Sequence, residues 1–238
     1  GCTALEKVVL PEALTDIYSY AFRDCAALKD IPFPDSLTGL GSRSFQNCVS
    51  LSQIKLSDTV TGIGGSAFEN CLSLSSATLG KNISVIGEAA FAECVLLKEI
   101  SIPDKVNTIG KEAFDGCELL EKVNISNASV LNSLGNYAFR DCKSLTSLDL
   151  PSELADMGDG IFKGCVSINN VVVPEAVLSL PKETFYGCTS LTDVVLPDLY
   201  KIGESSFVNC TSLTKMNIPD TVNEIGKKAF SGCTSLES

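Results

Sequence analysis

The eleven cysteines of this 238-residue chain recur at one nearly constant spacing. Successive steps are 23 residues long except for one of 25 and one of 22, with the cysteines at positions 2, 25, 48, 71, 94, 117, 142, 165, 188, 210 and 233. Ten of the eleven phenylalanines keep the same spacing, each three residues before a cysteine. A fixed period of about 20–50 residues is typical of stacked repeats. The sequence therefore predicts a single repeat domain over residues 1–238, made of about ten 23-residue units.

Each unit is expected to contain a strand, a bend and a helical turn. Between Cys94 and Cys117, residues 100–102 alternate apolar and polar, as in a short strand with one buried face. Pro103 ends this strand because it has no N–H to donate, and Gly110 marks a second bend. The next apolar residues are Ala113, Phe114, Cys117 and Leu120. Their spacing of about three predicts one or two turns of 3₁₀ or α-helix with this stripe inward.

Units of this length must stack, because one unit cannot bury its own apolar stripe. We expect the strands to form a continuous parallel sheet. A two-residue insertion within 126–133 and a one-residue deletion within 198–201 both fall between strand and bend, where loops absorb length changes. The predicted fold is an α/β repeat solenoid, with the parallel sheet on the concave face and short helical turns or 3₁₀ segments on the convex face.

Three sequence segments of the unit carry a family resemblance. Leu97-x-x-Ile100-x-Ile102, Ile109-Gly110 and Ala113-Phe114-x-x-Cys117 resemble the leucine-rich repeat, specifically the BspA-like type, and the resemblance covers the whole chain. It implies a right-handed superhelix. The asparagine ladder of the general leucine-rich repeat is absent, since the expected positions carry Ala13, Ser36, Thr59, Asn82, Lys105 and Thr221. This departure supports the BspA-like type, in which the Cys and Phe columns carry the inner packing.

The resemblance also implies a function. Members of this family are typically surface or secreted proteins of host-associated bacteria and some parasitic protists, with adhesion to host matrix proteins and other cells as the associated role. The implied function is a non-enzymatic protein-binding or adhesion module at the cell surface or outside the cell. Its partner would be a host extracellular-matrix or cell-surface protein, or a protein of a neighbouring cell. The alternative is a structural spacer or stalk that holds another domain away from the cell surface.

Composition excludes most catalytic and metal chemistry. The chain has no histidine, which removes the commonest general base, the Ser/His and Cys/His nucleophile pairs and every histidine-containing metal site. Carboxylates are scattered over every unit, and no Cys-x-x-Cys pair or glycine-rich phosphate loop occurs. We therefore expect no catalytic residues, no cofactor and no metal, and a chain that is not an enzyme.

The net charge and the hydropathy of the chain argue against nucleic acid and against a membrane-spanning segment. The formal net charge of −11 repels phosphate backbones and anionic lipid head groups, so nucleic acid is not an expected partner. No apolar run approaches the roughly 20 residues that span a bilayer, so no membrane insertion is expected. The repeat is entered mid-unit at Cys2 and left mid-unit at Ser238, which indicates a cropped part of a longer chain.

The cysteines allow two interpretations. Cysteines on neighbouring units would be close enough for a disulfide framework. An odd number in identical repeat positions favours free, buried thiols that pack as small apolar side chains. Cys2 also permits a lipidated N-terminal cysteine, although its place in the repeat already explains it.

The outward residues of the strands are the expected binding surface, because a solenoid presents them as one extended face. Two such columns are read from the alternation. The central column is Val9, Pro32, Lys55, Thr78, Ser101, Asn124, Asp149, Val172, Val195 and Asn217. Val172 and Val195 fall on adjacent units and are bordered by Asn170 and Asp193, so these four residues are the candidate partner-binding site. The plain alternative is a solvated sheet face, since valine is common in strands.

Overall fold

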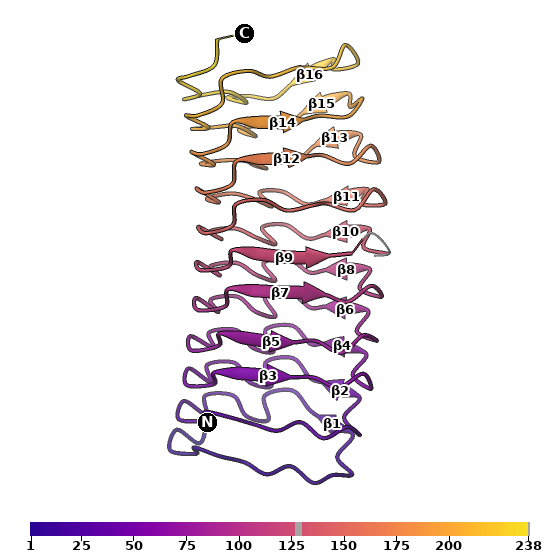
Figure 1. Cartoon of the computed structure of the whole chain (residues 1–238), viewed down its shortest axis with the longest axis vertical. Coiled ribbons are helices and arrows are strands. Elements are labelled where there is room, and N and C mark those ends of the chain that lie inside the picture. The colour runs from indigo at the N-terminus through magenta and orange to yellow at the C-terminus, as the bar shows by residue number, and fades with distance from the viewer. Residues whose placement is uncertain (127–129, 238) are drawn as a thin grey trace.

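A computed structural model describes residues 1–126 and 130–237 as one stack of similar coils (Figure 1). All strand pairs are parallel, and most join residues 23 positions apart, such as Asp16 and Gly39. The offset is 25 where Thr108 lies opposite Ser133, and 22 where Ser179 lies opposite Lys201. The sequence period is therefore the stacking period, and the parallel solenoid is confirmed.

The strands predicted from the alternation form the first of two rows. They are β3 (Gln53–Lys55), β5 (Ser76–Thr78), β7 (Glu99–Ile102), β9 (Lys122–Ile125), β12 (Asn170–Val172) and β14 (Asp193–Val195). They are hydrogen-bonded two by two, as β3–β5, β7–β9 and β12–β14, and Lys7 and Asp30 form an isolated bridge. The expected continuous sheet is therefore divided into separate ladders. We call the outward surface of this row the strand face.

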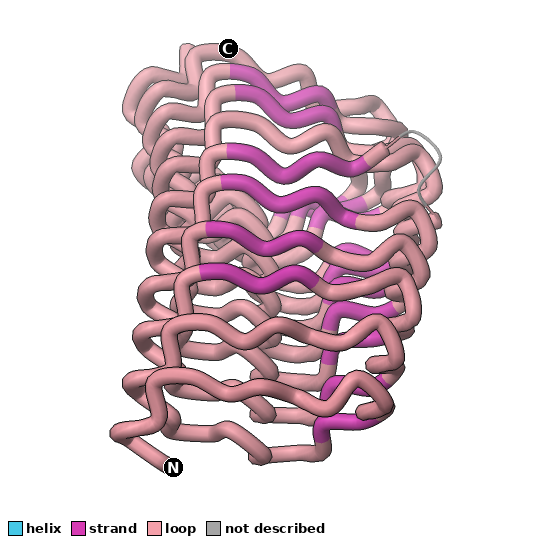
Figure 2. The backbone as a smooth tube through the Cα atoms, turned by 60° about the horizontal axis from the view of Figure 1, so that its bottom comes forward, coloured by secondary structure: helices cyan, strands magenta, loops and turns pink. Residues whose placement is uncertain are grey.

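A second row of two-residue strands lies at the position where only a bend was expected, on a different side of the coil (Figure 2). Seven of these strands form one sheet: β1 (Asp16–Ile17), β2 (Gly39–Leu40), β4 (Gly62–Ile63), β6 (Val85–Ile86), β8 (Thr108–Ile109), β10 (Ser133–Leu134) and β11 (Asp156–Met157). Three more form a second sheet: β13 (Ser179–Leu180), β15 (Lys201–Ile202) and β16 (Glu224–Ile225). Glycine follows most of them because coils approach closely here. A Cβ on Gly110 would lie 2.6 Å from the backbone nitrogen of Glu88.

The expected helical or 3₁₀ turns are wrong, since the described residues contain no helix. The segment before each cysteine is instead a run of turns. Glu112 and Gly116 have φ angles of 56° and 68°, in the left-handed region, and such residues interrupt a right-handed helix. Nine of the ten residues that precede Cys25 to Cys233 are Gly, Asn or Asp, the types that accept this conformation.

Backbone hydrogen bonds in this segment alternate between local and inter-coil partners. The N–H of Cys117 donates to the carbonyl of Phe114 at 3.2 Å, which closes a local turn. The N–H of Phe114 donates instead to the carbonyl of Ala138, one unit further along, at 2.9 Å. A helix would use all of these donors within one unit. The turns therefore serve the stack, because half of their donors bind the next coil.

The phenylalanine column forms a continuous stack of rings through the core. Neighbouring ring centroids lie 5.2 to 6.2 Å apart. Phe114 lies between Phe91 at 5.5 Å and Phe139 at 5.3 Å, nearly parallel to both. Phe33, which is outside the repeat spacing, meets the ring of Phe45 edge-on. The inward phenylalanine column is therefore confirmed.

All eleven cysteines are free, as expected, and nine thiols donate to a backbone carbonyl of the preceding unit. The Sγ of Cys117 lies 3.2 Å from the carbonyl oxygen of Phe91. The same oxygen accepts the N–H of Cys94 at 3.2 Å. The thiol thus acts as a small apolar side chain with a weak donor. The inward column is wrong at its first member, because Cys2 is exposed.

Burial keeps these thiols protonated. Desolvation raises the pKa of Cys48 to about 12, and the neighbouring Cys25 adds to the effect. Desolvation also raises the pKa of Cys210 to about 12, with Cys233 as the next cause. The pKa values of Cys94 and Cys142 are raised well above the ordinary value for the same reason. A protonated thiol is neither a nucleophile nor a metal ligand.

Replacing Phe114 by alanine should lower the free energy of unfolding by about 3–5 kcal/mol, because it removes a fully buried ring from between two others. The loss falls in one unit of a nearest-neighbour stack, so the transition should also broaden or split. Urea unfolding followed by circular dichroism measures both. Phe33→Ala is the matched control and should cost less, because Phe33 is only partly buried. An unchanged transition for Phe114→Ala would contradict the stack.

Thiol labelling should separate Cys2 from the rest of the column. In the native protein we expect one fast-reacting thiol, Cys2, and slower reaction at the partly buried Cys233. Denaturation without reductant should release eleven thiols to Ellman's reagent. The variant Cys2→Ser should lose the fast phase alone. Several fast native thiols, or a mass short by pairs of hydrogens, would overturn the arrangement.

Stability should fall at alkaline pH. The folded pKa of Cys48 and Cys210 exceeds the ordinary value of 9.0, so the unfolded chain loses these protons first. Their contribution to stability is complete below pH 9.0 and is lost as pH rises through the window from 9.0 to about 12. The urea midpoint measured across this window should therefore decline. The decline should be shallower in Cys48→Ser, whose hydroxyl does not titrate, and an equal slope in both proteins would refute the assignment.

Candidate interaction surface

The candidate residues lie together on β12 and β14. Val172 lies directly opposite Val195 in the parallel ladder, and Asn170 lies opposite Asp193. Val172 is 62% exposed and Val195 is 50% exposed. The intervening Val171 is buried in the core, as the alternation requires. The structure therefore brings the four predicted residues into one outward patch two coils high, while their role in binding stays a prediction.

The two polar members of the patch differ in their bonding. Asn170 donates from Nδ2 to the Oδ1 of its neighbour Asn169 at 2.8 Å. Asp193 is exposed, and its carboxylate has no ion pair or side-chain hydrogen bond within the part of the chain that the structure describes. The patch therefore combines an apolar pair with one uncompensated negative charge.

Sequence reasoning missed a row of acidic residues at the turn that follows the strands. Glu175, Asp198 and Asp220 each come directly after a proline, and all three are exposed. None of their carboxylates has a hydrogen-bond or ion-pair partner among residues 1–126 and 130–237. The signal was visible as the dipeptides Pro-Glu and Pro-Asp, but only the strand residues were read as columns.

A second apolar pair was missed for the same reason. Leu178 is 61% exposed and Tyr200 is 50% exposed. They lie on adjacent coils, since the N–H of Tyr200 donates to the carbonyl of Leu178 at 2.9 Å. The equivalent positions on earlier coils are polar and carry Thr15, Thr38, Thr61, Ser84, Asn107 and Asn132. The column therefore becomes apolar only past Asn132.

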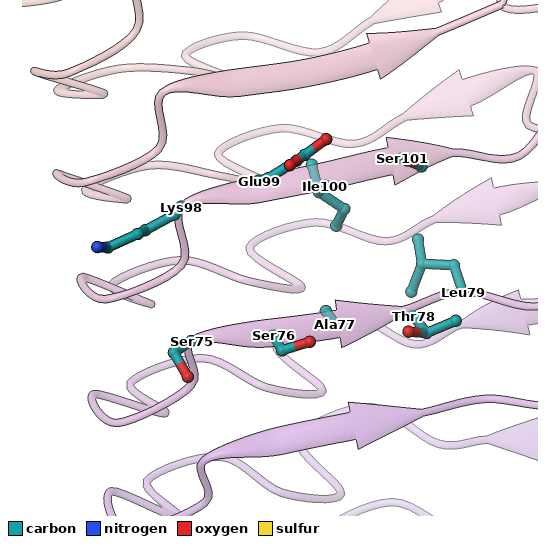
Figure 3. Close-up of a pocket in the computed structure, with 9 residues that line it drawn as sticks. All are labelled: Ser75, Ser76, Ala77, Thr78, Leu79, Lys98, Glu99, Ile100 and Ser101. Carbon is teal, nitrogen blue, oxygen red and sulfur yellow. The ribbon is translucent and has the colours of Figure 1, made fainter.

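The strand face has a depression where two neighbouring strands are not hydrogen-bonded to each other. A depression of about 450 Å³ lies between β5 and β7, which are not paired (Figure 3). Ala77 points inward on β5, where β3 carries Ile54 and β7 carries Ile100, so this coil fills less of the core. Four of the nine lining residues are serine or threonine, and Lys98 and Glu99 lie at one end.

The depression offers little chemistry. Its carboxylate, Glu99, accepts a hydrogen bond from Nδ2 of Asn124 at 2.6 Å and lies 3.9 Å from the amine of Lys122. These contacts partly compensate the charge of Glu99, and Asn124 also donates to the hydroxyl of Ser101 at 3.2 Å.

Other chemistry is also sparse. In the described part of the chain, no three His, Cys, Asp or Glu side chains are grouped so that they could hold a metal ion. The same residues include no helix with the length and apolar character to span a membrane. Nothing in the structure shows catalytic activity.

Comparisons with solved structures support the fold. A leucine-rich repeat protein from Bacteroides ovatus is 28% identical, with a TM-score of 0.78, over 99% of this chain and 72% of that chain. A leucine-rich repeat protein from T. pallidum is 25% identical, with a TM-score of 0.55, over 90% of this chain and 78% of that chain. A leucine rich cell surface protein from Faecalibacterium prausnitzii is 21% identical, with a TM-score of 0.68, over 98% of this chain and 80% of that chain. The search of curated proteins found no match.

The family model decides the classification. The model of the BspA type leucine rich repeat region matches residues 1–121 and 109–237, so nearly the whole chain is covered. Repeats of this architecture are protein-interaction or structural modules. The chain belongs to the BspA-type leucine-rich repeat family.

Proposed function

We propose that this chain is an adhesive, protein-binding module of a secreted or cell-surface protein, and that it recognises a host or neighbouring-cell protein through the strand face. Val172 and Val195 form the apolar contact, and Asn170 and Asp193 give polar support. The observation that carries this proposal is the exposure of two valines, 62% and 50%, directly opposite each other in one ladder. Burial of each valine by a partner is worth on the order of 1 kcal/mol or more.

The geometry of the strand face supports this site. A stable interface takes about 800 Å² from each partner. Neighbouring coils lie about 4.8 Å apart, so several of them together offer a broad surface. The β12–β14 ladder is also rigid, because its inner residues Val171 and Val194 are in the core. A rigid surface loses little entropy on binding.

The family and its relatives support the location. The F. prausnitzii relative is named a cell surface protein, and another similar fold is a pneumococcal vaccine antigen. A surface protein meets host matrix proteins directly, which makes extracellular-matrix proteins the partner class to test first.

A spacer or stalk is the second candidate. The strand face of the middle coils favours it, because Ser76, Thr78 and Ser101 are small, polar and exposed. The stacked phenylalanines would give such a stalk stiffness along its axis.

The double variant Val172→Asp with Val195→Asp should lose at least about tenfold in affinity, because a partner would have to bury two unpaired carboxylates. The measurement is surface plasmon resonance against a panel of purified extracellular-matrix proteins, with circular dichroism to show that folding is intact. Thr78→Asp with Ser101→Asp is the matched control, since it adds the same charge to the same column on other coils. Equal affinity of the Val172/Val195 variant and the parent would refute the site.

Two deletions separate the binder from the spacer. Removing residues 166–210 deletes two units that carry the candidate site, and removing residues 72–117 deletes two units that do not. A binder should lose the matrix protein only with the first deletion, whereas a spacer predicts the same result for both. If the parent binds no protein of the panel, adhesion to the matrix is wrong and the spacer is supported.

A further inference from the structure

Two outward columns become apolar on the two coils that carry the candidate site, and they flank an acidic turn position that recurs on most coils. The strand face has Val172 and Val195, the turn after each strand has Glu175 and Asp198, and the position beyond the turn has Leu178 and Tyr200. All six are exposed. We call these six residues the acidic corner.

The turn between the two apolar pairs is tight on both coils. In the first, the N–H of Val177 donates to the carbonyl of Pro174 at 3.0 Å. In the second, the N–H of Leu199 donates to the carbonyl of Pro197 at 2.8 Å, because this unit is one residue shorter. Apolar side chains therefore emerge on both sides of one acidic edge, within a few residues of each other along the chain.

The middle coils show the contrast. The strand position there carries Thr78 and Ser101, and the position beyond the turn carries Ser84 and Asn107. At the turn itself, Lys81 forms an ion pair with Asp58 of the preceding coil at 2.7 Å. The repeat architecture therefore does not require apolar residues at the strand position or beyond the turn, whereas an acid at the turn is common along the chain.

Negative charge around the corner is not neutralised by nearby lysines. Lys201 is paired with Glu224 at 2.7 Å, and Lys182 lies 3.4 Å from Asp159. Among the described residues, the carboxylates of Asp149, Asp193, Glu175, Asp198 and Asp220 have no such partner. Lys215 lies on the next coil, at the repeat position of Asn170 and Asp193. A surface with this balance attracts cations and repels anions.

We propose that the partner of the acidic corner is a basic protein segment, in which lysine or arginine alternates with apolar side chains, and that it crosses the edge to contact both apolar pairs. This proposal rests on the proposed protein-binding function and names the chemistry of the partner. Glu175 and Asp198 face the basic groups, and the valines and Leu178 receive the apolar ones. Tyr200 offers a ring face to an arginine or lysine of the segment.

The test uses three synthetic peptides of equal length: alternating lysine and leucine, alternating lysine and serine, and alternating glutamate and leucine. Affinity for the whole chain is measured by fluorescence anisotropy at low and at physiological salt. The lysine–leucine peptide should bind most tightly, and added salt should weaken it. Glu175→Gln with Asp198→Asn should weaken it by about tenfold, since two favourable charge contacts are lost. Leu178→Ser with Tyr200→Ser should weaken it without reducing the salt dependence.

A matched control occupies the same repeat position at the other end. Glu12→Gln with Asp35→Asn makes the same change in net charge after Pro11 and Pro34, and it should leave the affinity unchanged. Equal weakening by both pairs would mean attraction to the net charge alone and would overturn the proposal. So would absence of peptide binding, or equal affinity for the lysine–serine or glutamate–leucine peptide. These outcomes leave the matrix-protein result for Val172→Asp with Val195→Asp standing, so the two proposals fail separately.

Discussion

The carbonyl group of each repeat phenylalanine is the point on which the stack depends. The oxygen of Phe91 accepts the N–H of Cys94 in its own unit and the thiol of Cys117 from the next, both at 3.2 Å. The N–H of Phe91 donates to Ala113 at 2.8 Å, also in the next unit. A buried carbonyl without such partners would be costly. One residue therefore closes the local turn, joins two coils and adds a ring to the stack, which explains why Phe and Cys share one spacing.

At the turn that follows the strand position, hydroxyl groups stand where the general leucine-rich repeat has its asparagine ladder. The Oγ of Ser36 lies 2.6 Å from the carbonyl oxygen of Glu12, and the Oγ1 of Thr59 lies 2.7 Å from that of Asp35. Asn82 reaches the carbonyl of Asp58 with its amide at 2.8 Å. Serine, threonine and asparagine therefore all serve as short donors to the preceding coil at this position, although Lys105 and Ala176 show that the stack tolerates other residues there.

Sequence reasoning found the coil period, the inward Phe column and the outward valine pair, because each depends on local alternation or spacing. It failed at Ala113, Phe114 and Cys117, where a spacing of three fits both a helix and successive turns. The deciding feature was the left-handed residue before the cysteine, such as Gly116, and the sequence shows it only as a preference for Gly, Asn and Asp. The second row of strands, such as Thr108–Ile109, depends on bonds between residues about one period apart, which no local pattern reveals.

Only the outward positions of such a chain are free to change and form a binding surface, because the inward residues pack in the core and hold the coils together. Val171 and Val194 hold the ladder whatever their exposed neighbours are, so Val172 and Val195 can vary without changing the coil. A substitution at an outward position of one unit alters the surface of one coil only. Two adjacent units with the same change give a patch whose equivalent residues lie directly opposite each other in register. The acidic corner has this form, since valine, acid and a large apolar residue recur in the same order on both coils. The repeat therefore determines both the stability of the stack and the area of the surface that a partner can contact.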